Sequence, residues 1–226
     1  RLQSAPGNAE CSHMNSRTIR IVLALAGLVA VAAAISVTWV RFYGDVEPAA
    51  TQAGFEPAAA PGGPFSLVDH SGKRVSDQTF RGSFLLVFFG YTYCPDFCPT
   101  TLQGIAITMD MLGEKATRVR PLFITVDPER DTPESMAIYV GTFDHGIVGL
   151  TGAPEEIKKV ADRYRVFYAK SRDGSPGEGE ASHYTVDHGA FTYLMGPDGK
   201  YVTHFAYGVS PQTMAKEIRR YIDKLK

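Results

Sequence analysis

The longest apolar run in the chain covers residues 21–40, twenty consecutive residues without a charged side chain. An α-helix rises about 1.5 Å per residue, so a helix of this length would match the ~30 Å hydrocarbon core of a bilayer. Two arginines precede the run (Arg17 and Arg20) and one follows it (Arg41), which favours a cytoplasmic N-terminus. We therefore expect one uncleaved transmembrane helix. A cleaved signal peptide is the alternative, because the alanines at 32–34 offer small residues at a cleavage site.

The segments on either side of this run differ from it in composition. The chain begins without Met, whereas a start at Met14 would place the basic stretch MNSRTIR before the apolar run, as in a signal anchor. We expect translation to begin there, within a leader that covers residues 1–20, which would leave Cys11 outside any functional argument. Residues 41–63 are rich in Ala, Pro and Gly and predict a flexible tether. Residues 64–226 have the size of one globular domain.

Within residues 64–226 the apolar pattern alternates between strands and helices. A continuous apolar run at 84–91 is typical of a central strand buried on both faces, and the mostly apolar segment 119–126 predicts a second buried strand. Helical spacing and proline start signals predict helices at 100–116, 132–143, 153–164 and 210–225. Shorter strands are predicted at 65–69, 147–150, 191–195 and 201–205, and the polar segment 171–182 predicts a loop or hairpin tip. This order predicts an α/β domain, a mixed sheet flanked by helices on both faces, of which the thioredoxin-like fold is one example.

Composition and charge narrow the possible functions. The chain has 23 Lys and Arg against 24 Asp and Glu, a formal net charge of −1, with 3 cysteines in 226 residues. A nucleic-acid-binding protein needs a basic surface to neutralise phosphates, so this balance argues against a nucleic-acid partner. The cysteines are too few for a disulfide-stapled scaffold. What is left is a globular domain with a localised chemical site.

The candidate chemistry lies directly after the strand at 84–91. Cys94 and Cys98 are four residues apart in the segment YCPDFCP, so on a helical turn both sulfurs project from one face. At the start of a helix, backbone amides favour the thiolate form. The pair itself allows a structural disulfide, a redox dithiol or a soft metal site. Its three-residue spacing departs from the two-residue spacing of the thioredoxin motif, and two thiolates alone do not complete a zinc site.

Three motifs, GYTYCPDFCPTTL, ITVDPERDTPE and VDHGAFTYLMGPDG, together resemble the Sco/SenC family of membrane-anchored, copper-binding, thioredoxin-like proteins. The resemblance covers about residues 64–226. It implies copper, as Cu(I) or Cu(II), with two cysteine ligands that match Cys94 and Cys98 and a distal histidine ligand that matches His188. It also implies a role in assembling cytochrome c oxidase, with the binuclear copper centre of subunit II as the target and other copper carriers as further partners.

Several residues near these motifs have more than one interpretation. Without the cysteines, His188 would be interpreted as a hydrogen-bonded surface residue before a strand, and His183 is its rival as the third ligand. Two thiolates and one imidazole suit Cu(I), and Cu(II) would add an oxygen donor. We expect Asp96 to cap the helix that follows, with a charge beside the metal ligands as the alternative. We expect Asp127 and Asp131 to be turn and capping residues. For Asp127, a place beside the metal is the alternative.

The sequence thus predicts a membrane-tethered copper chaperone that transfers copper, reduces target cysteines, or does both. Enzymatic activity stays open, because Cys94 and Cys98 are also a candidate catalytic redox pair that would form a disulfide bond on oxidation. The alternatives are a thiol–disulfide oxidoreductase without a metal and a copper or redox sensor. The short N-terminus has no Arg-rich amphipathic helix, which favours the bacterial inner (cytoplasmic) membrane, with the domain in the periplasm, over the mitochondrial inner membrane.

Overall fold

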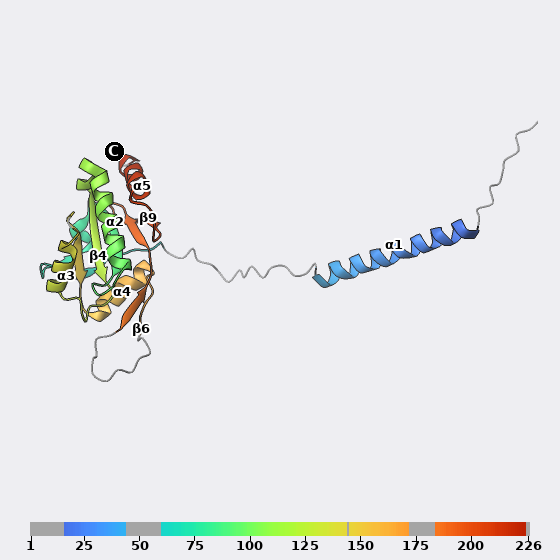
Figure 1. The fold of residues 1–226 in the computed structure, drawn as a ribbon, viewed down its shortest axis with the longest axis horizontal. Coiled ribbons are helices and arrows are strands. Elements are labelled where there is room, and N and C mark those ends of the chain that lie inside the picture. Colours follow the sequence, from blue (N-terminus) through green and yellow to red (C-terminus); the bar gives the residue numbers. More distant parts are fainter. Residues whose placement is uncertain (1–15, 44–59, 144, 172–183, 225–226) are drawn as a thin grey trace, which may run out of the picture. The chain divides into compact units, whose positions relative to one another are not determined.

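The computed structural model describes residues 16–43, 60–143, 145–171 and 184–224. The chain divides into two units, Arg1–Ala58 and Ala59–Lys226. In the first unit the structure describes one helix, α1 (Ser16–Tyr43), which contains the whole apolar run predicted from the sequence (Figure 1). Across the described residues, no helix combines the length and apolar character required to span a membrane. Met14 and most of the predicted tether lie outside the described residues.

The second unit is built on a seven-stranded sheet with the order β2-β1-β5-β4-β3-β8-β9. Its strands are β1 (Ser66–Asp69), β2 (Arg74–Ser76), β3 (Phe84–Gly90), β4 (Val119–Thr125), β5 (Val148–Thr151), β8 (Thr192–Met195) and β9 (Tyr201–Phe205). β3 and β4 run parallel in the middle, and every residue of β3 is buried. β8 lies antiparallel to β3 and forms a hairpin with β9. The prediction of a mixed sheet around two apolar central strands is confirmed.

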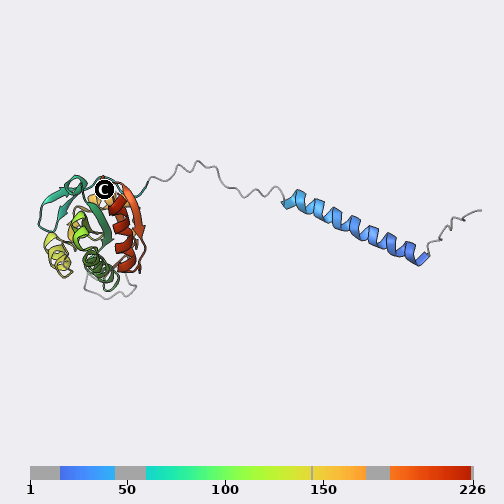
Figure 2. The ribbon, with the colours of Figure 1, turned by 90° about the horizontal axis from the view of Figure 1, so that it is seen from above.

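Helices cover both faces of this sheet. They are α2 (Phe97–Leu112), α3 (Pro133–Gly141), α4 (Pro154–Tyr164) and α5 (Pro211–Lys224), with short 3-10 helices η1 (Asp77–Phe80) and η2 (Gly113–Arg118). Neighbouring residues of a strand point to opposite faces of the sheet. Phe88 contacts Phe97 of α2, whereas the next residue, Phe89, contacts Tyr164 of α4. α5 packs against α2 (Figure 2). This is the predicted thioredoxin-like architecture.

Two local predictions need correction. The helix expected at 100–116 begins at Phe97, so Cys98 lies in its first turn, and its last part is the 3-10 helix η2. A second sheet joins β6 (Tyr168–Ser171) to β7 (Thr185–His188), strands that the sequence pattern did not predict. Both strands have only four residues and lack an alternation of buried and exposed positions, so the hydrophobic signal of a strand is weak there. The segment between them, with His183, lies outside the described residues.

Candidate metal centre

The two cysteines lie where β3 passes into α2. Cys98 is fully buried in the first turn of α2, and Cys94 is half-buried in the loop before it. The backbone N–H of Cys98 donates a hydrogen bond to Sγ of Cys94 at 3.4 Å. Asp96 occupies the N-cap position, but its side chain makes no capping hydrogen bond to the backbone. The expected capping role of Asp96 is therefore wrong. At this helix start, the Cys94 sulfur accepts a hydrogen bond from a backbone amide instead.

The last residue of β3 makes room for the buried sulfur. A Cβ atom at Gly90 would lie 2.6 Å from Sγ of Cys98 and 2.8 Å from a ring carbon of Phe123. Both distances are shorter than a carbon side chain tolerates, so only glycine fits beside the sulfur. The sequence analysis missed this residue, although a glycine that ends an apolar strand directly before the cysteine motif indicates a close approach.

His188 reaches the cysteines from the end of β7. Its Nε2 lies 3.5 Å from Sγ of Cys98, and its Nδ1 lies 3.1 Å from the carbonyl oxygen of Gly189. Because a carbonyl oxygen only accepts, the Nδ1 atom carries the proton and Nε2 presents a lone pair to the sulfur. Aromatic rings contact the imidazole with their edges or faces at centroid distances of 5.5–6.1 Å: Phe97, Tyr91 and Phe88. These rings hold the imidazole in one orientation.

The three side chains form one compact donor group. Sγ of Cys94, Sγ of Cys98 and the imidazole nitrogen of His188 all lie within 4.8 Å of one another. In the parts of the chain that the structure describes, no other group of three His, Cys, Asp or Glu side chains is arranged to hold a metal ion. Two sulfur donors and one imidazole are a soft donor set that suits Cu(I). The structure thus brings together all three residues predicted from the sequence.

The two thiols differ in acidity. A hydrogen bond from the Cys98 thiol to the Cys94 sulfur lowers the pKa of Cys94 to about 4. The same hydrogen bond to Cys94, together with burial and the negative charge that forms on Cys94, raises the pKa of Cys98. At neutral pH the pair therefore holds one proton, on Cys98. A metal ion that binds both sulfurs must displace this proton.

The loop after β4 is joined to the cysteine loop by a buried carboxylate. Asp131 is fully buried and accepts hydrogen bonds from the backbone N–H of Thr92 at 3.1 Å and from the Thr92 hydroxyl at 2.5 Å. The Thr125 hydroxyl donates a further bond at 2.5 Å. Burial raises the pKa of the Asp131 carboxyl despite these donors. The cap of α3 is Thr132, so Asp131 is a link between two loops instead of the expected cap.

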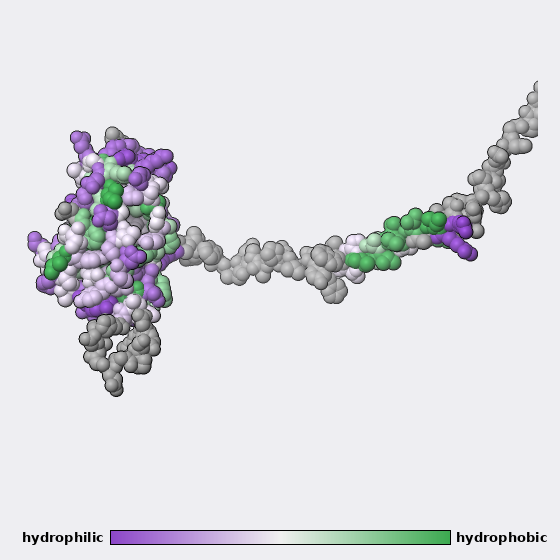
Figure 3. Space-filling model, viewed as in Figure 1, coloured by the Kyte–Doolittle hydropathy of each residue, from purple (hydrophilic) through white to green (hydrophobic). Residues whose placement is uncertain are grey.

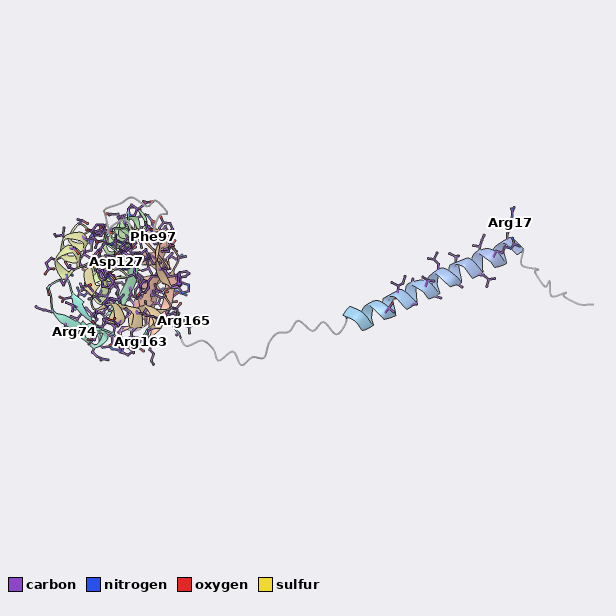
Figure 4. All side chains as sticks on the ribbon, turned by 90° about the horizontal axis from the view of Figure 1, so that it is seen from below. Arg17, Arg74, Phe97, Asp127, Arg163 and Arg165 are labelled. Atoms are coloured by element: carbon purple, nitrogen blue, oxygen red, sulfur yellow. The ribbon has the colours of Figure 1, made fainter. Side chains whose placement is uncertain are left out.

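Asp127 is also fully buried within the second unit (Figure 4). It forms an ion pair with Arg130 and accepts a hydrogen bond from the Tyr184 hydroxyl at 2.6 Å. Its backbone carbonyl accepts from the N–H groups of Arg130 and Asp131, as expected of a turn residue. Asp127 is not part of the Cys-Cys-His donor group. Its side-chain partners are Arg130 and Tyr184.

Comparison with known proteins identifies the family. The family model described as SCO1/SenC matches residues 54–223. The chain belongs to the SCO1/SenC family. It is 42% identical to Protein sco1 of Schizosaccharomyces pombe over 161 residues, which cover 71% of this chain and 60% of that protein. It is 34% identical to a SCO2-like protein of Rickettsia conorii over 207 residues, which cover 91% of this chain and 98% of that protein.

Solved structures of SCO1/SenC proteins share the fold. The structure of Bradyrhizobium japonicum ScoI with copper bound is 44% identical and matches with a TM-score of 0.65, over 72% of this chain and 99% of that chain. The structure of Arabidopsis thaliana ScoI with copper bound is 40% identical, with a TM-score of 0.66, over 73% and 99%. The predicted family and the thioredoxin-like fold of the domain are confirmed. The prediction of copper agrees with these copper-bound relatives and with the Cys-Cys-His group of this chain.

Proposed function

We propose that this protein binds copper through Cys94, Cys98 and His188 and delivers it during the assembly of cytochrome c oxidase. The observation that carries the proposal is the donor group itself, with two sulfurs and one imidazole nitrogen within 4.8 Å at the start of α2. Copper in the relatives supports the choice of metal. A solved Sco protein, 24% identical to this chain, is named as a member of a family of cytochrome c oxidase assembly proteins. Subunit II, which carries the binuclear copper centre, is the partner that we propose.

In this proposal copper is the substrate of the site, and the protonation states of the three side chains suit copper binding. Cys94 is a thiolate at neutral pH because its pKa is about 4, so it binds metal without losing a proton. Cys98 gives up its proton when the metal binds, and Nε2 of His188 supplies a neutral donor. A target protein with cysteine ligands would then accept copper by ligand exchange. The same thiolate at Cys94 is able to attack a target disulfide, so copper transfer and thiol reduction use one pair of sulfurs.

We further propose that residues 21–40 anchor the protein in the bacterial inner membrane, with the domain at 64–226 on the periplasmic side. This segment carries no charged residue, and it lies within one continuous helix of 28 residues, α1. Large apolar side chains of α1 are exposed, among them Leu28 at 71% and Val29 at 68% (Figure 3). A relative that matches this chain over nearly its whole length comes from the bacterium Rickettsia conorii. These observations favour a bacterial membrane over the mitochondrial inner membrane.

The copper site is tested by titrating the reduced protein with Cu(I) against a Cu(I) chelator. We expect one Cu(I) per wild-type chain. Cys94→Ser, Cys98→Ser and His188→Ala should each weaken binding at least tenfold, which corresponds to about 1.4 kcal/mol. His204→Ala is the matched control, because this exposed histidine lies on β9, outside the Cys-Cys-His group, and its Nδ1 pairs with the Tyr201 hydroxyl at 2.5 Å. Wild-type affinity in all three site variants would refute the proposed ligands.

A thiol–disulfide oxidoreductase without a metal is the second candidate, favoured by the lowered pKa of Cys94. The two functions differ in their dependence on His188. For a copper protein, His188→Ala should lose affinity for Cu(I) while its dithiol still forms a disulfide at close to the wild-type rate. For an oxidoreductase, copper should stay substoichiometric in wild type and variant, and disulfide exchange should change instead. Measuring both quantities on the same two proteins separates the candidates.

A further inference from the structure

The metal donors come from two segments that belong to different sheets. Cys94 and Cys98 follow β3 of the seven-stranded sheet, whereas His188 ends β7 of the separate two-stranded sheet. The ladder between β6 and β7 orders this hairpin internally, with Tyr168 opposite His188. It does not fix the hairpin relative to the cysteines. Contacts between the hairpin and the rest of the domain must therefore set the distance between the imidazole and the sulfurs.

Arg130 makes such contacts to both segments. Its guanidinium carbon lies 4.8 Å from the ring centroid of Tyr93, which directly precedes Cys94. The same carbon lies 3.8 Å from the ring centroid of Tyr184, the residue before β7. A nitrogen of the guanidinium also donates a hydrogen bond to the Tyr184 carbonyl oxygen at 3.2 Å. One planar cation thus lies against an aromatic ring from each donor-bearing segment.

Arg130 is itself held in place by buried groups. Its side chain is only 14% exposed and forms an ion pair with Asp127, which is fully buried. Asp127 also accepts the Tyr184 hydroxyl at 2.6 Å, so the carboxylate and the guanidinium hold the same tyrosine at opposite ends. On the hairpin side, the ammonium nitrogen of Lys170 lies 4.8 Å from the Tyr184 ring. A planar guanidinium stacks on aromatic rings and donates several hydrogen bonds at fixed angles, which a lysine or an aliphatic residue would not reproduce.

We propose that Arg130 is a positioning residue of the copper site, which docks the β6–β7 hairpin against the cysteine loop and so sets His188 next to Cys98. The inference rests on the proposed function, because it assigns Arg130 an effect on copper affinity through His188. Arg130 does not itself bind the metal. Replacing Arg130 should leave both thiols available for copper, but the His188 imidazole should no longer be held at one fixed position beside them. Groups that orient a metal ligand typically change the affinity by about 10- to 100-fold when they are removed.

The test is a double-mutant cycle on Cu(I) affinity in the full chain, with wild type, Arg130→Met, His188→Ala and the double variant. We expect Arg130→Met to weaken Cu(I) binding about tenfold in the wild-type background and to have no further effect in the His188→Ala background. A purely structural role for Arg130 would lower the affinity by the same factor in both backgrounds. Arg220→Met is the matched control, because Arg220 also lies over a tyrosine ring, that of Tyr221 at 4.8 Å, but on α5.

A second variant covers the case in which Arg130→Met fails to fold with Asp127 left unpaired. Tyr184→Phe removes only the hydroxyl that donates to Asp127 and keeps the ring against Arg130. It should weaken Cu(I) binding less than Arg130→Met, and again only when His188 is present. If His188→Ala weakens binding but Arg130→Met and Tyr184→Phe act equally in both backgrounds, or not at all, the positioning role is wrong and the copper site stands. If His188→Ala has no effect, the proposed ligand set and the positioning role both fall.

Discussion

Sγ of Cys98 and Nε2 of His188 lie 3.5 Å apart, although 90 residues separate them in the chain. The sulfur comes from the first turn of α2 and the imidazole from the end of β7. Local structure alone does not bring them together, since the described part of the intervening chain contains η2, β4, α3, β5, α4 and β6. The donor group therefore exists only in the folded domain, and copper binding and folding stability are linked.

This link predicts that Cu(I) stabilises the protein. With free copper at about 100 times the dissociation constant, binding to the folded state alone adds about 2.7 kcal/mol. For a domain of this size, we expect the midpoint of thermal unfolding to rise by roughly 5–10 °C. A chelator that removes copper should reverse the shift. In a Cys98→Ser variant, copper should leave the midpoint almost unchanged, and an equal shift in that variant would place the metal elsewhere.

The acidity of Cys94 predicts the pH profile of its reaction with iodoacetamide. An ordinary thiol has a pKa of about 8.5 and slows tenfold for each pH unit below it. Because the hydrogen bond from Cys98 lowers the pKa of Cys94 to about 4, its alkylation rate should be nearly constant above this value. Peptide mapping should find the label on Cys94 and not on buried Cys98. Cys98→Ala removes the hydrogen-bond donor, so its profile should move back toward that of an ordinary thiol.

Gly90→Ala should destabilise the domain and displace the buried sulfur. The added methyl group would lie 2.6 Å from Sγ of Cys98, and overpacking of this kind costs about 1–3 kcal/mol. Gly104→Ala in α2 is a matched control, because, apart from the backbone of its own helix turn, nothing in the described structure lies within 4 Å of its Cβ position, and alanine favours a helix. Chemical denaturation should show a lower free energy of unfolding for Gly90→Ala. For Gly104→Ala it should show a free energy of unfolding that is higher by up to about 1 kcal/mol. Equal stability of both would contradict the close approach at Gly90.

Thr92→Val should destabilise the domain in a pH-dependent way. Valine keeps the shape of threonine but removes the hydroxyl that donates to buried Asp131, at a cost of about 1–3 kcal/mol. Burial raises the pKa of Asp131 above its unfolded value, so ionised Asp131 lowers stability as the pH rises through the raised pKa. Removing a donor penalises the ionised form further. The loss should therefore be larger at neutral pH than near the pKa of a free carboxyl, about 4, as measured by denaturant midpoints.

The parts of the fold that the sequence predicted well have strong local signals. Every residue of β3 is apolar and buried, and every residue of β4 except Arg120 is buried, because both faces of these strands are covered. β6 and β7 gave no such signal, since their four-residue strands are mostly half-buried. The predicted start of α2 lies three residues late, at Thr100 instead of Phe97, because the apolar residues at helical spacing begin only at Leu102.

The sequence predicted the three donor residues of the site but not the residue pairs that hold the surrounding loops together. The family motif supplied His188, whereas the partners of Thr92 and Tyr184 come from far along the chain. Asp131 is 39 residues from Thr92, and Arg130 is 54 residues from Tyr184. No periodicity or spacing rule relates such pairs, so only the folded chain reveals them. Both partners lie in the motif ITVDPERDTPE, to which the sequence analysis assigned turn and capping roles.

The unequal burial of the two cysteines sets the order in which they take part in copper or disulfide exchange. Cys94 is half-buried, whereas Cys98 has no exposed surface and its sulfur lies close beside Gly90. An incoming thiolate therefore meets Cys94 first, and the bond to Cys98 should be the last to break when copper leaves. The same order holds for a disulfide, in which the external thiol should form its mixed disulfide with Cys94. A Cys98→Ser variant should thus trap a target protein on Cys94, and the captured cysteine would identify the recipient.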